Sequence, residues 1–210
     1  MKNNRAQKKC DINALDYIEN ECHYQHARMV SEITGIMAIN LGWEPDVVIT
    51  TKNAALLHDI GKNFIPKEIL NKPDKLTSAE YDIIKTHAEL GYDYLTFQLD
   101  EAKPLGYARD TLHLASIIAL QHHERINGSG YAGMKGDDIH IVAKCVAIAD
   151  VFDALYSFRP YKEPWSIAEI IETFVDGYGT LFDPKCVDIL FGSLDDVLIL
   201  YRGTSEFDEY

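Results

Sequence analysis

The segment Ala54-Ala55-Leu56-Leu57-His58-Asp59-Ile60-Gly61-Lys62 carries an apolar helical run into a histidine, an aspartate, a glycine and a lysine. Adjacent helix positions point about 100° apart, so His58 and Asp59 do not easily bind one ion from one face. An aspartate has two oxygens and can bridge two ions, so the doublet suits a metal pair. Lys62, one turn further on, is placed to approach a phosphate. Neighbouring His and Asp are common by chance, so the doublet needs partners elsewhere.

Length and composition favour one ordinary globular domain. The chain has 210 residues, of which 47% are hydrophobic and 25% charged, enough for one core and too few for two comfortable ones. We expect a loose N-terminal segment at 1–19, the domain at 20–200 and an acidic tail at 201–210. No apolar run approaches the roughly 18 residues of a membrane span, and no signal peptide is apparent. We therefore expect a cytoplasmic protein.

Charge and cysteine usage exclude several classes of function. The net charge of −13 leaves no basic stripe to neutralise the phosphates of DNA or RNA polymers. The four cysteines have no CxxC spacing, which predicts reduced thiols rather than a disulfide or structural zinc framework. They are Cys10, Cys22, Cys145 and Cys186.

Apolar residues recur at helical spacing along the whole chain, and no β-alternation or repeat is present. The pattern predicts an all-α, compact, single-domain bundle with about seven or more helices. Thr77-Ser78-Ala79-Glu80 is a capping box, and Pro45 suits a helix first turn. We expect helices at about 20–41, 45–59, 66–71, 77–99, 112–125, 138–157, 166–177 and 184–200, with a connector at 100–110.

Asp150 is the sharpest clue outside the doublet. The helix around it is apolar almost all round and should be buried. A buried carboxylate costs several kcal/mol unless it is paired or binds a metal. A salt bridge is the alternative, but Lys144 is nearly two turns away. A metal ligand is the favoured interpretation.

Several histidines also lie on otherwise apolar helix faces. Each alone suits a structural role: His26 as a polar flank and His87 as a core residue. His122 and His123 end a buried helix before the loop Asn127-Gly128-Ser129-Gly130-Tyr131. Together with Arg125, this glycine-rich loop favours phosphate binding more than a glycine loop alone does.

Seven candidates on five helices describe a nitrogen- and oxygen-rich cavity in a helical core, of the kind that holds two divalent transition ions. Such ligands suit iron, manganese or zinc. The seven are His26, His58, Asp59, His87, His122, His123 and Asp150.

Over roughly residues 20–195 the chain closely resembles the HD-GYP domain, the helical subgroup of the HD phosphohydrolase superfamily. The matching motifs occur in the family's order. Besides the seven residues above, they are Ile60-Gly61-Lys62, Ile69-Leu70-Asn71-Lys72-Pro73, Glu124-Arg125, Gly128-Ser129-Gly130-Tyr131, Asp153-Ala154-Leu155, Arg159-Pro160-Tyr161 and Phe182-Asp183-Pro184.

The resemblance implies a metal-dependent phosphodiesterase that opens cyclic di-GMP to pGpG and often onward to GMP. The same seven residues match metal-ligand positions, with iron or manganese favoured. Two cations about 3.5–4 Å apart would share a water and lower its pKa, giving a bridging hydroxide that attacks phosphorus. Lys62 with Asp59 is expected in the catalytic step. The residues expected to hold the substrate are Lys62, Arg125, Tyr131, Arg159 and Lys162.

Three positions depart from the family pattern. Ala132 replaces the proline that ends the naming motif, so the loop loses a φ restraint and we expect it to be more mobile. Asn127 replaces an aspartate. Cys22 stands where members with three metals carry a glutamate, so we favour two metals over three.

A second class of function is a degenerate domain that binds the dinucleotide, or a partner protein, without turnover. A third is a phosphohydrolase of another cyclic dinucleotide or of a nucleotide. The drifted loop favours the second class, whereas the complete ligand set and Lys62 favour the enzyme. The expected partners are a cyclic dinucleotide and, for regulation, a signalling protein or a second copy of the chain.

Overall fold

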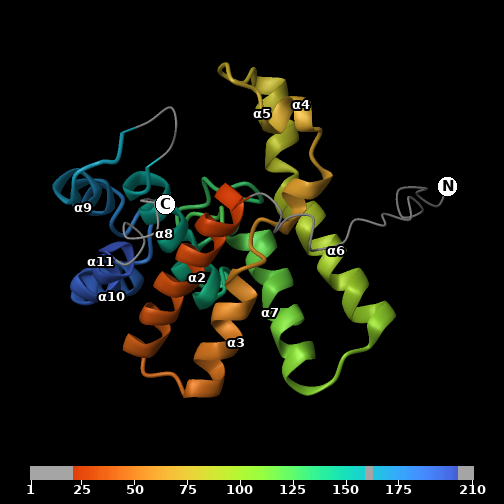
Figure 1. The fold of residues 1–210 in the computed structure, drawn as a ribbon, viewed down its shortest axis with the longest axis horizontal. Coiled ribbons are helices and arrows are strands. Elements are labelled where there is room, and N and C mark those ends of the chain that lie inside the picture. Colours follow the sequence, from red (N-terminus) through yellow and green to blue (C-terminus); the bar gives the residue numbers. More distant parts are fainter. Residues whose placement is uncertain (1–20, 159–162, 203–210) are drawn as a thin grey trace, which may run out of the picture.

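The computed structural model describes residues 21–158 and 163–202, the side chains of 21–23 excepted, and the described chain is a helical bundle (Figure 1). This confirms the all-α prediction. The α-helices are α2 (Glu21–Asn40), α3 (Pro45–Ala55), α4 (Lys67–Leu70), α5 (Ser78–Lys85), α6 (His87–Ala102), α7 (Gly106–Gln121), α8 (Ile141–Tyr156), α9 (Ile167–Asp176), α10 (Pro184–Gly192) and α11 (Leu194–Arg202), with 3₁₀ helices η1 (Ile60–Phe64) and η2 (Gly136–Asp138).

Five longer helices build the core. Helix α2 packs on α3 and α8, and α7 packs on α3 and α6. Figure 1 shows α9, α10 and α11 grouped beside α8, whereas α4 and α5 project from the bundle. Helix α8 is buried from Val142 to Ala149, as its apolar sequence predicted. Because α8 has neighbours on nearly every side, any polar group on it must find a partner inside the protein.

The helix that begins at Pro45 is shorter than predicted. It ends at Ala55, and His58 and Asp59 lie in the turn that leads into η1. The backbone N–H of His58 donates to Ala55 O at 3.2 Å, an i→i−3 bond that marks the end of the α-helix. The premise that His58 and Asp59 are adjacent helix positions was therefore wrong. Their directions are set by a turn.

Two other predicted helices are each divided in two. The helix expected at 77–99 breaks at Thr86, whose Oγ1 and N–H both donate to Ile83 O. The helix expected at 184–200 breaks at Ser193, whose Oγ donates to Ile189 O at 2.7 Å. Hydroxyl side chains compete in this way with the helical backbone ladder. The predicted capping box at Thr77 is present, and α7 begins at Gly106, inside the expected connector.

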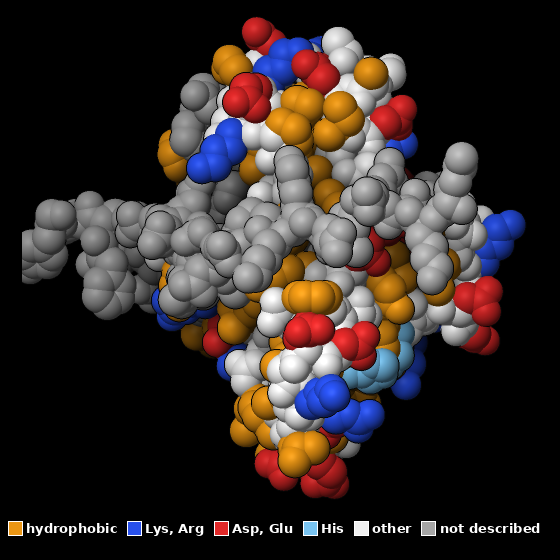
Figure 2. All heavy atoms as spheres, turned by 90° about the vertical axis from the view of Figure 1, so that its right-hand side faces the viewer, with side chains coloured by type: hydrophobic (Ala, Val, Ile, Leu, Met, Phe, Trp, Pro, Cys, Tyr) orange, Lys and Arg blue, Asp and Glu red, His pale blue; other side chains and the backbone are white. Residues whose placement is uncertain are grey.

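The outer face of the bundle is mixed in character. Figure 2 shows hydrophobic side chains among charged ones at the top of the molecule, over α4 and α5. The exposed side chains of this part of the chain include Leu76, Tyr81 and Ile83. Among the described residues, no helix is both long and apolar enough to cross a membrane. The expected N-terminal segment and most of the acidic tail lie outside the described residues.

Three small residues bring η1, α6 and α7 close together. A Cβ added at Gly61 would lie 1.9 Å from His87 O and 2.6 Å from Gly91 N. A Cβ added at Gly91 would lie 3.2 Å from Ala119 Cβ. Only glycine permits such an approach of two backbones. The contact holds the end of the His58–Asp59 turn directly against the first turn of α6.

We expect Gly61→Ala to destabilise the fold by roughly 2–3 kcal/mol, because the new methyl group must push η1 away from α6. Urea unfolding of the purified protein measures the change. Gly192→Ala is the matched control, since a Cβ at Gly192 meets nothing within 4 Å, and its effect should stay below about 1 kcal/mol. Equal stabilities of the two variants would contradict the close packing at Gly61.

Candidate metal centre

The carboxylate of Asp59 lies at the centre of a group of buried imidazoles. Its Oδ1 is 3.1 Å from His87 Nε2 and 3.6 Å from His122 Nε2, and its Oδ2 is 3.4 Å from His58 Nε2. The Lys62 ammonium donates to Oδ2. Burial raises the pKa of Asp59, but the positive charge of Lys62 outweighs it and holds that pKa well below its usual range. Asp59 is therefore a buried anion.

The other ring nitrogen of each of these histidines faces a backbone carbonyl. A carbonyl oxygen only accepts, so Nδ1 carries the hydrogen, and the Nε2 of a neutral ring then presents a lone pair. The lone pairs of His58, His87 and His122 are thus turned toward the Asp59 carboxylate. The carbonyls are those of Ala55 for His58 (2.9 Å), Ile84 for His87 (2.8 Å), and Ile118 (3.0 Å) and Ala119 (3.1 Å) for His122.

This arrangement contains more hydrogen-bond acceptors than hydrogen-bond donors. His58 Nε2 and Asp59 Oδ1 are buried and accept no hydrogen bond from the described part of the chain, although Oδ1 lies 3.1 Å from the His87 ring. His87 Nε2 and His122 Nε2 are 3.4 Å apart. Buried acceptors without donors are costly. Divalent cations would satisfy them, so the residues present fit metal ions.

The candidate donor atoms form two overlapping sets. One set is Asp59, His87, His122 and His123, the other is His26, His58 and Asp59, and in each the atoms lie within 4.8 Å of one another. That spread suits donors each about 2.0–2.2 Å from one ion. Asp59 belongs to both sets, which is the geometry expected of a bridging carboxylate.

His26 joins the group from α2 through two carboxylates of α8. Its Nδ1 lies 2.6 Å from Asp153 Oδ2, and its Nε2 lies 3.1 Å from Asp150 Oδ1. Burial lowers the pKa of His26, but the hydrogen bonds to Asp150 and then Asp153 raise it to about 9. Burial raises the pKa of Asp150, but its hydrogen bond to His26 outweighs this and holds that pKa below its usual range. Asp150 thus has an internal partner, His26, which the sequence alone did not reveal.

Asp153 is the residue that sequence reasoning left without a role. It is 1% exposed, and its Oδ1 accepts from Ser157 Oγ at 2.7 Å and from Tyr201 Oη at 2.8 Å. Both of its oxygens are therefore committed, so Asp153 orients His26 rather than competing for an ion. The sequence feature that could have indicated this role is the position of Asp153, one turn after Asp150 on the same buried helix.

The expected substrate-binding residues lie in different surroundings. Tyr131 stacks on His123 with ring centroids 4.5 Å apart. Burial and, to a smaller extent, the charge of neighbouring His122 lower the pKa of His123 to about 2. Arg125 donates to Glu124 O at 2.9 Å, and its guanidinium lies over the Phe182 ring. Arg159 and Lys162 lie outside the described residues, as do the side chains of Glu21 and Cys22.

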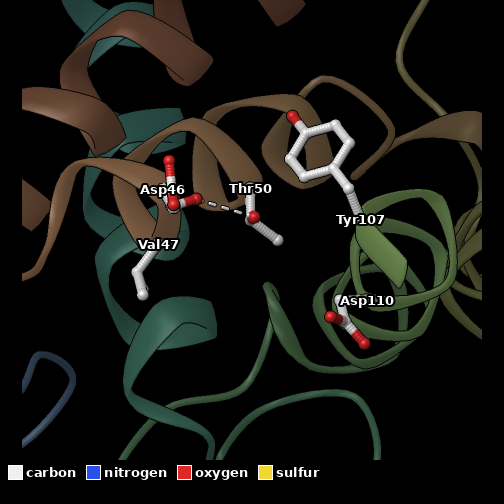
Figure 3. Close-up of a pocket in the computed structure, with 5 residues that line it drawn as sticks. All are labelled: Asp46, Val47, Thr50, Tyr107 and Asp110. Atoms are coloured by element: carbon white, nitrogen blue, oxygen red, sulfur yellow. Dashed lines mark hydrogen bonds between the residues drawn. The ribbon is translucent and has the colours of Figure 1, made fainter.

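The pocket drawn in Figure 3 is not this centre. Its volume is about 540 Å³, and it lies between the first turns of α3 and α7. His58 and His122 follow the opposite ends of these helices. Since a helix rises about 1.5 Å per residue, the two places are separated by most of the bundle's length. The lining residues are Asp46, Val47, Thr50, Tyr107 and Asp110.

Comparison with known proteins finds one family and several relatives. A family model described as an HD domain matches residues 12–186. The cyclic di-GMP phosphodiesterase response regulator RpfG of Xanthomonas campestris pv. campestris is 42% identical over 162 residues, which cover 77% of this chain and 40% of that protein. The 3'3'-cGAMP-specific phosphodiesterase 2 of Vibrio cholerae is 41% identical over 150 residues, which cover 71% of this chain and 27% of that protein.

The chain thus spans less than half the length of either relative. Among solved structures, an HDG"Y"P protein from Bdellovibrio bacteriovorus superposes with a TM-score of 0.63 at 23% identity. The match covers 82% of this chain and 52% of that one. This likeness independently supports the helical fold.

We expect Asp153→Asn to weaken the binding of Mn²⁺ or Fe²⁺ about 10- to 100-fold, because the amide no longer fixes the orientation of His26. Competition with a chromogenic chelator under anaerobic conditions measures the affinity, and circular dichroism checks the fold. Asp195→Asn makes the same chemical change at an exposed acid of α11 and should bind metal like the unmodified protein. Equal affinities in both variants would contradict the role of Asp153.

Proposed function

Because the chain belongs to the HD domain family, as its resemblance to HD-GYP domains predicted, we propose that it is a metal-dependent phosphodiesterase that hydrolyses cyclic di-GMP to pGpG. The linear product keeps one phosphodiester bond of the same kind, so GMP is the product of a second round. The match covers residues 12–186, which include every candidate ligand.

The observation that carries this proposal is the set of buried acceptors around Asp59. Three imidazoles present unprotonated nitrogens to one carboxylate, and His58 Nε2 and Asp59 Oδ1 accept no hydrogen bond from the described part of the chain. A plain hydrophobic core gains nothing from such a cluster, and leaving it unsatisfied is costly. We propose two divalent ions, iron or manganese, with Asp59 as the shared ligand. Nitrogen-rich donors without thiolates suit these metals.

When bound, the two ions would lower the pKa of a water and neutralise charge on the phosphate. The chain's own residues supply the remaining requirements. The Lys62 ammonium reaches Asp59, and its side chain is 27% exposed. It can therefore also donate to a non-bridging phosphate oxygen. Tyr131, stacked on His123, offers an aromatic face at the edge of the cluster.

We propose a cyclic dinucleotide as the substrate class because two relatives of nearly equal similarity are both named for such substrates. One is named a cyclic di-GMP phosphodiesterase at 42% identity and the other a 3'3'-cGAMP-specific phosphodiesterase at 41%. Identity alone therefore does not choose between the two dinucleotides. We propose cyclic di-GMP as the substrate and 3'3'-cGAMP as the competitor to test beside it.

A binding module without turnover is the second candidate. Ala132 and Asn127 in the glycine-rich loop favour it, because both depart from the family motif. The two sets of candidate donors that share Asp59 favour the enzyme. A domain that no longer binds metal gains stability by losing buried ligands, since each unsatisfied acceptor is destabilising.

Purified protein loaded with Mn²⁺ or Fe²⁺ should convert cyclic di-GMP to pGpG. Liquid chromatography measures the formation of the product. Asp59→Asn should lower turnover at least about 100-fold, because this one carboxylate serves both ions. Asp46→Asn, at the far end of α3, is the matched control and should turn over normally. Tight binding of the dinucleotide without product would support the binding module, and full activity of Asp59→Asn would contradict the proposed centre.

A further inference from the structure

Glu124 is a buried acid that the proposed chemistry does not use. It follows the His122–His123 pair after the end of α7, and it is 3% exposed. Its Oε1 accepts the backbone N–H of Ala132 at 2.7 Å, and its Oε2 accepts that of Met134, also at 2.7 Å. Both oxygens therefore bind the glycine-rich loop (residues 127–136). Glu124 is thus not available as a metal ligand.

The bond to Ala132 exists only because this residue is not proline. A proline at position 132 has no N–H to donate. The sequence alone predicted a more mobile loop at this position, because the φ restraint of proline is lost. The structure shows a different restraint, a hydrogen bond from the same backbone position to a buried carboxylate.

The loop also packs tightly on the peptide that carries Glu124. A Cβ added at Gly130 would lie 2.5 Å from Glu124 Cα and 2.8 Å from His123 O, so glycine is required there. The base of the loop is closed where Gly136 N–H donates to Ile126 O at 3.0 Å. Backbone packing and the two bonds to Glu124 thus fix the loop from the inside.

The side chain that this tether places is Tyr131, which directly precedes the first bonded amide. Its ring is tilted by 34° to the ring of His123 at 4.5 Å, and it meets the His87 ring edge-on at 6.2 Å. Tyr131 therefore lies against two candidate metal ligands. Movement of the loop backbone would take this ring away from both.

We propose that Glu124 is a positioning residue, which holds Tyr131 over His123 and so shapes the surface that a nucleotide meets beside the metal ions. This inference rests on the proposed function. The hydrogen bond between Glu124 and the Ala132 N–H then restrains the loop in place of the proline found in the family motif. The Gly-Tyr-Ala loop is then an ordered part of the site rather than a degenerate one.

The test is Glu124→Gln in the metal-loaded protein. The amide keeps one acceptor oxygen, but its NH₂ group faces the second backbone N–H, so only one of the two bonds survives. Hydrogen exchange at the Ala132 and Met134 amides should accelerate about tenfold or more. KM for cyclic di-GMP should rise about tenfold while kcat changes less, because Tyr131 contacts the substrate and not the reacting phosphorus.

Two further variants keep the test decisive. Glu101→Gln, at the exposed end of α6, makes the same change and should alter neither exchange nor KM. Glu124→Asp keeps the charge but shortens the side chain by one methylene, so the carboxylate no longer reaches both amides, and exchange at Ala132 and Met134 should again be faster than in the unmodified protein. This variant gives the answer if Glu124→Gln fails to fold.

The outcomes separate this inference from the proposed function. Unchanged amide exchange in both Glu124→Gln and Glu124→Asp overturns the tether, whatever the activity. Faster exchange with unaltered KM and kcat overturns the positioning role and leaves the phosphodiesterase intact. Absence of turnover in the unmodified protein, with faster exchange in the variants, counts against the proposed function. The proposal that Glu124 shapes a nucleotide-binding surface is then rejected as well, whereas the tether itself stands.

Discussion

The structure depends on one unfavourable arrangement, a buried carboxylate that faces imidazole nitrogens carrying lone pairs. Each histidine is held in this state because its Nδ1–H is tied to a backbone carbonyl of its own chain segment. The carbonyls thereby fix both the direction of each ring and the nitrogen that faces Asp59. Such outer contacts are typical of histidines that bind metals. Cations at the centre would turn mutual repulsion into attraction.

The fold brings this arrangement together at the ends of helices. His58 and His122 follow the last residues of α3 and α7, and His87 is the first residue of α6. Helix ends converge there because Gly61 allows η1 to touch the backbone of α6. His26 and Asp150 come instead from within α2 and α8, which pack side by side. The centre therefore joins three helix termini to two continuous helices.

Much of this was accessible from the sequence, because residue type and burial pattern identify polar groups in an apolar setting. The all-α class, the capping box at Thr77 and the candidate cluster all followed from local patterns. The helix end at Ala55 did not, since Gly61, which follows the turn, packs against the distant backbone of α6. The role of Asp153 was missed for a similar reason: its partners, His26 and Tyr201, lie 127 and 48 residues away in the sequence.

The glycine-rich loop shows why a departure from a family motif is weak evidence of lost function. A motif records residue types, whereas the loop is held here through backbone N–H groups that bond to Glu124. Ala132 lacks the ring that fixes φ in proline, yet it gains an N–H, and a buried carboxylate accepts it. Either device limits the same backbone freedom. The substitution therefore has to be judged by the partner of that N–H, and Glu124 is placed to be that partner by the same turn that presents His122 and His123 to the centre.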